Sequence, residues 1–143
     1  MSHLSDEEMG RFATAIAEML QIQLAVAGDR SIEDANGVIN RTAIGYVYGF
    51  LDAALRTIGQ DMSDTSIGVP ITFQVLRRVF PGREARYGEY LAPRMGTDPV
   101  VMLGAMRGGQ QYIDFNNNKL DAPMGLAKAI LEGDDGSLSA GRN

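Results

Sequence analysis

The chain has 143 residues, a hydrophobic fraction of 45% and no cysteine, so it fits one globular domain and has neither disulfides nor thiolate metal ligands. Its net charge of −5 argues against binding to DNA or to an anionic membrane surface. The acidic start does not fit a signal peptide and no apolar run is long enough to span a bilayer, so we expect a cytoplasmic protein.

The N-terminal segment has the signals of an amphipathic helix. Ser5 and Glu8 are spaced as a capping box, in which each side chain accepts a hydrogen bond from the other residue's amide. Large apolar residues then recur from Met9 to Leu24 at steps of one, three or four. Gly28 is a natural helix end.

A second helix is expected from Ser31 to about Ile58, because Ser31 opens another capping pattern and a long apolar stretch follows. The Asn36-Gly37 pair is a competing turn signal within this range. We expect the helix to pass through it, since apolar and small residues continue the helical period beyond it.

Proline and glycine divide the second half of the chain. No segment alternates apolar and polar residues, so we expect an all-α bundle of five or six helices. This bundle forms a single domain over 1–132, with a flexible tail over 133–143. The remaining predicted elements are a loop over 60–68, a helix with Pro70 in its first turn, a short helix over 83–91, a helix from Pro99 to about Phe115, and a helix over 124–131 capped by Asp121.

Two helices carry glycines at four-residue spacing. Glycine inside a helix costs about 0.5–1 kcal/mol relative to alanine, so several such positions require a compensating gain. Small residues on one helical face let two backbones approach closely, and we expect these two ridges to cross, within one subunit or across a dimer. The ridges consist of Gly45, Gly49 and Ala53 in one helix, and Gly104 and Gly108 in the other.

The arginine-rich segment, residues 77–94, is the one local excess of positive charge. Arginines interleaved with aromatic residues can bind phosphate, nucleic acid or an acidic protein segment. A solvated helix face is the alternative interpretation. The candidate binding residues are Arg77, Arg78, Arg83, Arg86, Tyr87 and Tyr90.

A second candidate site is a polar pocket around Asp52, which interrupts the most apolar stretch of the chain. Asp52 can form an ion pair with Arg56 four residues later, at the edge of the helix. Alternatively it lines a pocket between helices, for which the candidate residues are Tyr46, Tyr48, Asp52, Arg56, Arg107 and Gln111.

Motifs for metal and phosphate chemistry are incomplete. Asp114, Asn116 and Asn118 resemble the start of a calcium loop, but Lys119 stands where that loop needs glycine. Helical glutamate pairs and glycine-rich phosphate loops are absent, and the single histidine, His3, lies close to the N-terminus. We therefore expect no metal and no cofactor.

These observations favour a protein that works by protein–protein binding, as a homodimer. Apolar residues spread around the first two predicted helices beyond a single stripe, which is typical of a helix with a further partner. An acidic protein segment is a further possible partner. The alternative is a small-molecule or phosphate-binding protein, or an enzyme without a metal, using a pocket lined by arginine and tyrosine. Whether it is an enzyme stays open.

Overall fold

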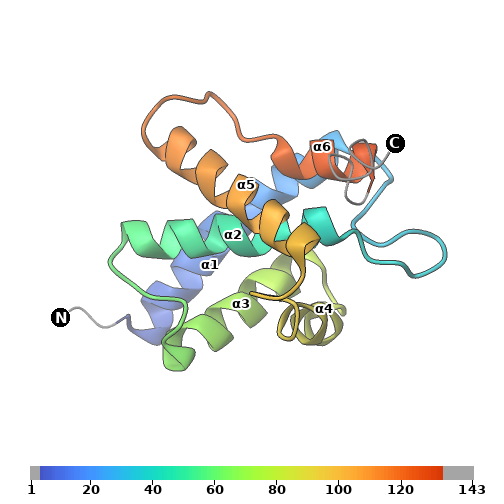
Figure 1. Cartoon of the computed structure of the whole chain (residues 1–143). Coiled ribbons are helices and arrows are strands. Elements are labelled where there is room, and N and C mark those ends of the chain that lie inside the picture. The colour runs from blue at the N-terminus through green and yellow to red at the C-terminus, as the bar shows by residue number, and fades with distance from the viewer. Residues whose placement is uncertain (1–3, 134–143) are drawn as a thin grey trace.

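The computed structural model describes residues 4–133 and confirms the all-α fold (Figure 1). His3 and the predicted tail after Gly133 lie outside the described residues. Across the described range there is no strand, and one isolated antiparallel bridge joins Glu33 to Ile39. The six helices are α1 (Asp6–Val26), α2 (Arg41–Thr57), α3 (Thr65–Val79), α4 (Glu84–Leu91), α5 (Pro99–Asn116) and α6 (Gly125–Glu132).

The helices with complete local start signals begin where the sequence predicts. Ser5 Oγ accepts the Glu8 amide at 3.1 Å, and Glu8 Oε1 accepts the Ser5 amide at 2.9 Å. At the start of α5, the Asp98 side chain accepts the amides of the second and third helical residues, and Pro99 occupies the first position. In both cases the orphan amides of the first turn are satisfied by a residue close in sequence.

The second helix begins at Arg41, and the prediction that it passes through Asn36 and Gly37 is wrong. Asp34 Oδ1 accepts the amides of Asn36 at 2.8 Å and Val38 at 2.9 Å, which stabilises a turn instead of a helix. Gly37 has a φ of +78°, a left-handed conformation that ends any right-handed helix. The turn signal therefore prevails over the helical period.

Asn40 makes the transition from this loop into α2. Its side-chain oxygen accepts the Ala43 amide at 2.9 Å, and its Nδ2 donates to the Ala129 carbonyl of α6 at 2.9 Å. The flanking apolar residues Ile32 and Ile39 are both buried and fix the loop to the core. One side chain thus caps α2 and connects it to α6.

Two further boundaries differ from the prediction. The α3 helix begins at Thr65, inside the predicted loop, because Asp64 caps it by accepting the Ser66 amide at 3.0 Å. Pro70 is therefore the sixth residue of α3 and does not lie in its first turn. The predicted cap of α6 by Asp121 is also wrong, since no side chain next to it in sequence caps that helix.

The α2 helix lies at the centre of the bundle, with 12 of its 17 residues buried. In Figure 1, α5 crosses in front of it, while α1 lies behind and α3 and α4 lie below. The large buried side chains of α2, such as Tyr46, Phe50 and Leu51, belong to the same core as residues of α1 and α3. This burial explains the most apolar stretch of the sequence.

The two glycine ridges meet at the crossing of α2 and α5, within one chain. At four glycines a Cβ atom would overlap a backbone carbonyl oxygen of the facing helix, so any larger residue would force the backbones apart. The Cα–H groups of these glycines face those oxygens, the geometry of weak Cα–H···O contacts. The facing pairs are Gly45 with Val101, Gly49 with Ala105, Gly104 with Thr42, and Gly108 with Tyr46.

The α5 helix contacts the bundle through a narrow face. Only four of its 18 residues are buried, and they are Val100, Val101, Gly104 and Gly108. Its other apolar side chains remain partly or largely exposed, in particular Met102, Met106 and Ile113. The outward side of α5 is therefore apolar without being covered by the described part of the chain.

Candidate functional site

Part of the arginine-rich segment is held by a carboxylate from the 31–40 loop. Glu33 accepts hydrogen bonds from Tyr87 Oη at 2.8 Å and from Arg86 Nη2 at 3.1 Å, and Arg83 Nη1 lies 3.8 Å away. Arg86 also donates to the Gly37 carbonyl at 2.9 Å. These contacts join α4 to the loop, and they give two of the predicted binding arginines a partner within the chain.

The electrostatics of this cluster are those of a stable ion pair. The hydrogen bonds from Tyr87 and Arg86 hold the pKa of Glu33 below its usual value. Burial, together with the hydrogen bond to Glu33, raises the pKa of Tyr87 to about 12. Glu33 is thus held as a carboxylate and Tyr87 as a neutral phenol, so neither is suited to exchange a proton near pH 7.

The other predicted residues of the segment do not join this cluster. The guanidinium of Arg77 lies over the Phe73 ring at 5.9 Å, and that of Arg94 lies over the Tyr90 ring at 3.7 Å. Arg78 is exposed on α3, where its backbone carbonyl accepts a hydrogen bond from α1. The six candidates are therefore spread over α3 and α4 and do not converge on one point.

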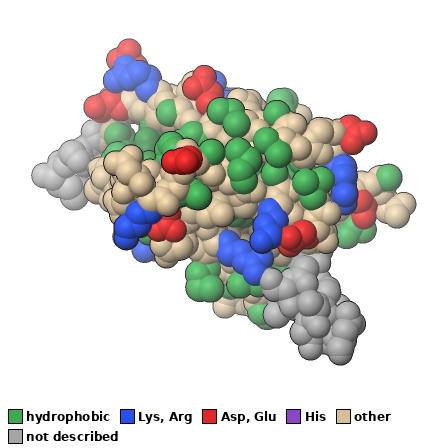
Figure 2. All heavy atoms as spheres, turned by 90° about the horizontal axis from the view of Figure 1, so that it is seen from above, with side chains coloured by type: hydrophobic (Ala, Val, Ile, Leu, Met, Phe, Trp, Pro, Cys, Tyr) green, Lys and Arg blue, Asp and Glu red, His purple; other side chains and the backbone are tan. Residues whose placement is uncertain are grey.

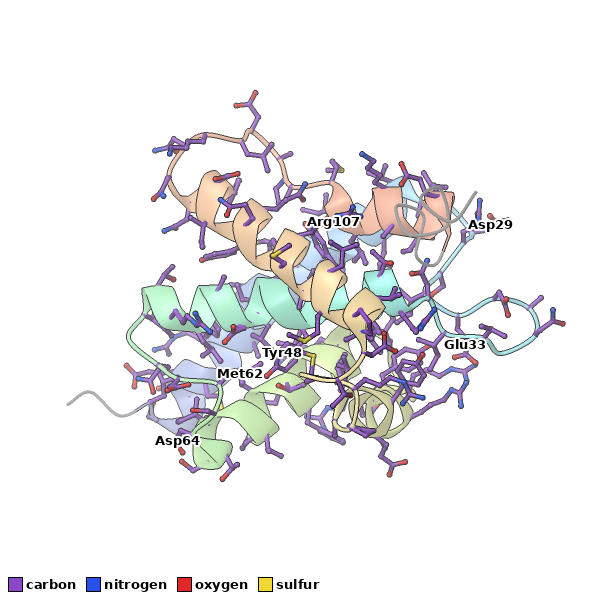
Figure 3. All side chains as sticks on the ribbon, in the orientation of Figure 1. Asp29, Glu33, Tyr48, Met62, Asp64 and Arg107 are labelled. Carbon is purple, nitrogen blue, oxygen red and sulfur yellow. The ribbon has the colours of Figure 1, made fainter. Side chains whose placement is uncertain are left out.

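The predicted pocket residues fall on opposite sides of the α2–α5 crossing. On one side, Tyr48 and Asp52 lie near Arg56, whose Nη2 is 3.0 Å from Asp52 Oδ2. Burial and the Asp52 charge raise the pKa of Tyr48. On the other side, Tyr46, Arg107 and Gln111 line a separate hollow of about 400 Å³ beside α6. Figure 3 shows Tyr48 and Arg107 apart from each other.

The hollow beside α6 contains a capping network. Gln111 Oε1 accepts the Tyr46 hydroxyl at 2.6 Å and the Gly125 amide at 2.8 Å, and Gln23 Oε1 accepts the Leu126 amide at 2.9 Å. Burial raises the pKa of Tyr46 to about 12, although the nearby Gln23 side chain and Gly125 amide act in the opposite direction. Two glutamines from α1 and α5 thus satisfy the first amides of α6, which is a structural role.

The largest hollow on the described surface is an apolar groove between α2 and α5, of about 970 Å³. We call it the α5 groove. Its floor is formed by the small residues Gly49, Ala53, Ala105 and Gly109, and its α5 wall by the exposed side chains Met102, Met106 and Ile113. Asp52 and Arg56 stand on its α2 wall.

The methionine and isoleucine of this wall were not among the candidates predicted from the sequence. The signal was present, because Met102, Met106 and Ile113 recur at steps of four and seven, on the flank of α5 beside the glycine ridge. Seen from above, where α6 and the end of α5 lie, hydrophobic side chains gather between charged ones (Figure 2). Exposed apolar area is thus present on more than one face.

The described residues offer little for metal chemistry. No three His, Asp or Glu side chains within residues 4–133 are placed to hold a metal ion. Over the same range, none of the helices has both the length and the hydropathy needed to cross a membrane. In comparisons with known proteins, the chain matches no family model, no curated protein and no solved structure.

Proposed function

We propose that this protein works by protein–protein binding through the α5 groove, and that the partner is a second copy of the same chain. The observation that carries this proposal is the uncovered apolar side of α5, which is exposed although only four residues of the helix are buried. A helix of 18 residues is about 27 Å long, so its side chains offer a continuous contact surface. Contiguous exposed apolar surface of this kind is typical of interaction sites.

The shape of this face supports self-association over an unrelated partner. A ridge formed by Met102, Met106 and Ile113 stands beside the hollow over Gly49 and Ala53. In a two-fold dimer the same patch is used by both copies, so a face needs both a ridge and a hollow to be complementary to itself. Methionine side chains adapt readily to such a hollow.

The charges at the edge of the groove are compatible with a two-fold arrangement. Asp52 and Arg56 lie one helical turn apart, so an antiparallel copy can place each beside the opposite charge. The net charge of −5 opposes association over long distances. At about 0.15 M salt that repulsion is screened beyond roughly 8 Å, and contacts in the groove decide the outcome.

The test is the mass in solution, measured by light scattering over a range of concentrations at 0.15 M salt. The wild-type chain should have twice its monomer mass, and Met106→Glu should shift dissociation to at least about tenfold higher concentration, because a carboxylate would be buried without a partner. Ile22→Glu is the matched control, since Ile22 is 60% exposed, Met106 is 67% exposed, and Ile22 is distant from the groove.

Two results would contradict the proposal. One is a monomeric wild-type chain at about 100 μM, well above the dissociation constant of a stable dimer. The other is a dimer that Met106→Glu leaves unchanged while Ile22→Glu dissociates it, which would move the interface to α1.

A further inference from the structure

A second cavity, of about 350 Å³, lies between α2, α3 and α4 and is separate from the capping network. Its wall is mostly apolar, and Tyr48 and Met62 lie together in the middle of the molecule in Figure 3. This volume is within the range of pockets that hold small molecules. The wall residues used below are Tyr48, Met62, Gly68, Phe73, Glu84 and Gly88.

Glu84, in the first turn of α4, places a carboxylate in this apolar wall. Its Oε1 is shielded from solvent and accepts no hydrogen bond from any described residue. A buried polar atom without a partner costs about 1–3 kcal/mol, and more when it carries charge. Glu33, by contrast, receives hydrogen bonds from Tyr87 and Arg86. No arginine or lysine lines the cavity, so the chain itself supplies no cation to Glu84.

Gly88 lies one helical turn after Glu84, on the same face of α4, and leaves the space beside it open. A Cβ atom built at Gly88 would meet nothing within 4 Å. Gly68 in the same wall is different, since its Cβ would overlap the Met62 carbonyl oxygen and packing there requires glycine. At Gly88 the helix accepts the cost of a glycine, about 0.5–1 kcal/mol, without a close contact that explains it.

We propose that this cavity binds a small molecule with an apolar body and a protonated amine, held by the Glu84 carboxylate. An ammonium group supplies the hydrogen-bond donors and the positive charge that Glu84 lacks. The rings of Tyr48 and Phe73 in the wall favour a cation and accommodate an apolar body. An acid or a phosphate would meet Glu84 without any compensating cation, so anionic ligands are excluded.

The experiment compares three probes of one shape: 4-phenylbutylamine, 4-phenylbutanol and 4-phenylbutyrate. Each is titrated into the full chain at pH 7, and binding is followed by NMR shifts. The amine should bind, the alcohol should bind roughly tenfold more weakly, and the acid should not bind. Glu84→Gln should weaken the amine roughly 10- to 100-fold and leave the alcohol unchanged.

A second variant tests the location independently of charge. Gly88→Leu places a side chain in the open space and should abolish binding of both the amine and the alcohol. Gly10→Leu is the matched control, because Gly10 is also helical and also has nothing within 4 Å of a Cβ, but lies on α1 far from the cavity. The chain's circular dichroism confirms that each variant is folded.

The proposal is overturned if the amine binds no better than the acid, or if no probe binds the wild-type chain at millimolar concentration. It is also overturned if Gly88→Leu binds the amine as tightly as Gly10→Leu does. An amine that binds equally to wild type and Glu84→Gln would show an apolar cavity without the carboxylate contact that defines the proposed ligand class.

Discussion

Gly49→Ala should destabilise the protein, although alanine is the better helix former. A Cβ atom at Gly49 would overlap the Ala105 carbonyl oxygen and lie 2.6 Å from the Ala105 Cα. Ordinary contacts begin at about 3.4 Å, so α5 must move away by roughly 0.8 Å. The obstacle is backbone, so no rotation of a side chain relieves it.

The magnitude follows from two opposing effects. Overpacking a close contact costs about 1–3 kcal/mol, and the upper end applies here because the whole helix must shift. Better helix propensity returns about 1 kcal/mol. The net loss is about 2 kcal/mol, which lowers the melting temperature by roughly 4–8 °C in a chain of this size.

The assay is thermal unfolding followed by circular dichroism, with Gly10→Ala as the control. Gly10 is helical with no atom within 4 Å of a Cβ, so the same substitution there should raise stability by about 0.5–1 kcal/mol. The two variants should therefore shift the melting temperature in opposite directions. If Gly49→Ala melts at or above the parent's temperature, the backbone contact between α2 and α5 does not exist in solution.

Two further predictions concern the 31–40 loop. Asn40→Ala should cost about 2–3 kcal/mol in urea unfolding, because it removes the cap at Ala43 and the donor to the buried Ala129 carbonyl, whereas Asn40→Asp, which keeps only the cap, should recover part of this loss. Because the pKa of Glu33 is lowered from 4.5, its stabilisation is complete above that pH and is lost as the pH falls through the lowered value; Glu33→Gln should be less stable at pH 7 and lose less on acidification. The pKa of Tyr87 is raised from 10.0 to about 12, so stability should fall as the pH rises between these values, and Tyr87→Phe should reduce that slope; equal slopes in parent and variants would contradict the Glu33–Tyr87 contact.

The helices could be predicted wherever their start signals are local. Ser5, Glu8 and Asp98 satisfy amides within three residues of themselves, so their roles can be read from spacing alone. The glycine spacing likewise pointed to a close crossing, because an unfavourable residue repeated on one face requires a packing reason. It did not decide between a crossing within the chain and one between subunits, since sterics are the same in both.

The elements that depend on distant partners could not be predicted. The first amides of α6 are capped by Gln111 and Gln23, and Gln23 lies 103 residues before the amide it caps. The 31–40 loop was mistaken for helix because its apolar residues fit both patterns, while the Asp34 turn that decides the matter is a single side-chain interaction.

The candidate sites were least predictable, because charge in the sequence says nothing about pairing. Arg83 and Arg86 looked like a surplus until the fold brought Glu33 to them across about 50 residues of chain. Glu84 drew no notice as an ordinary first-turn acid, and only its position in a cavity wall distinguishes it.

The glycine crossing also determines the relief of the surface around it. Where two helices meet through side chains, the side chains fill the valleys beside the contact. Here the meeting is backbone against backbone, so the valleys on both flanks stay open, as the α5 groove on one side and the hollow beside α6 on the other. The width of the α5 groove is then fixed by main-chain geometry, and its walls can change in sequence while its dimensions remain the same.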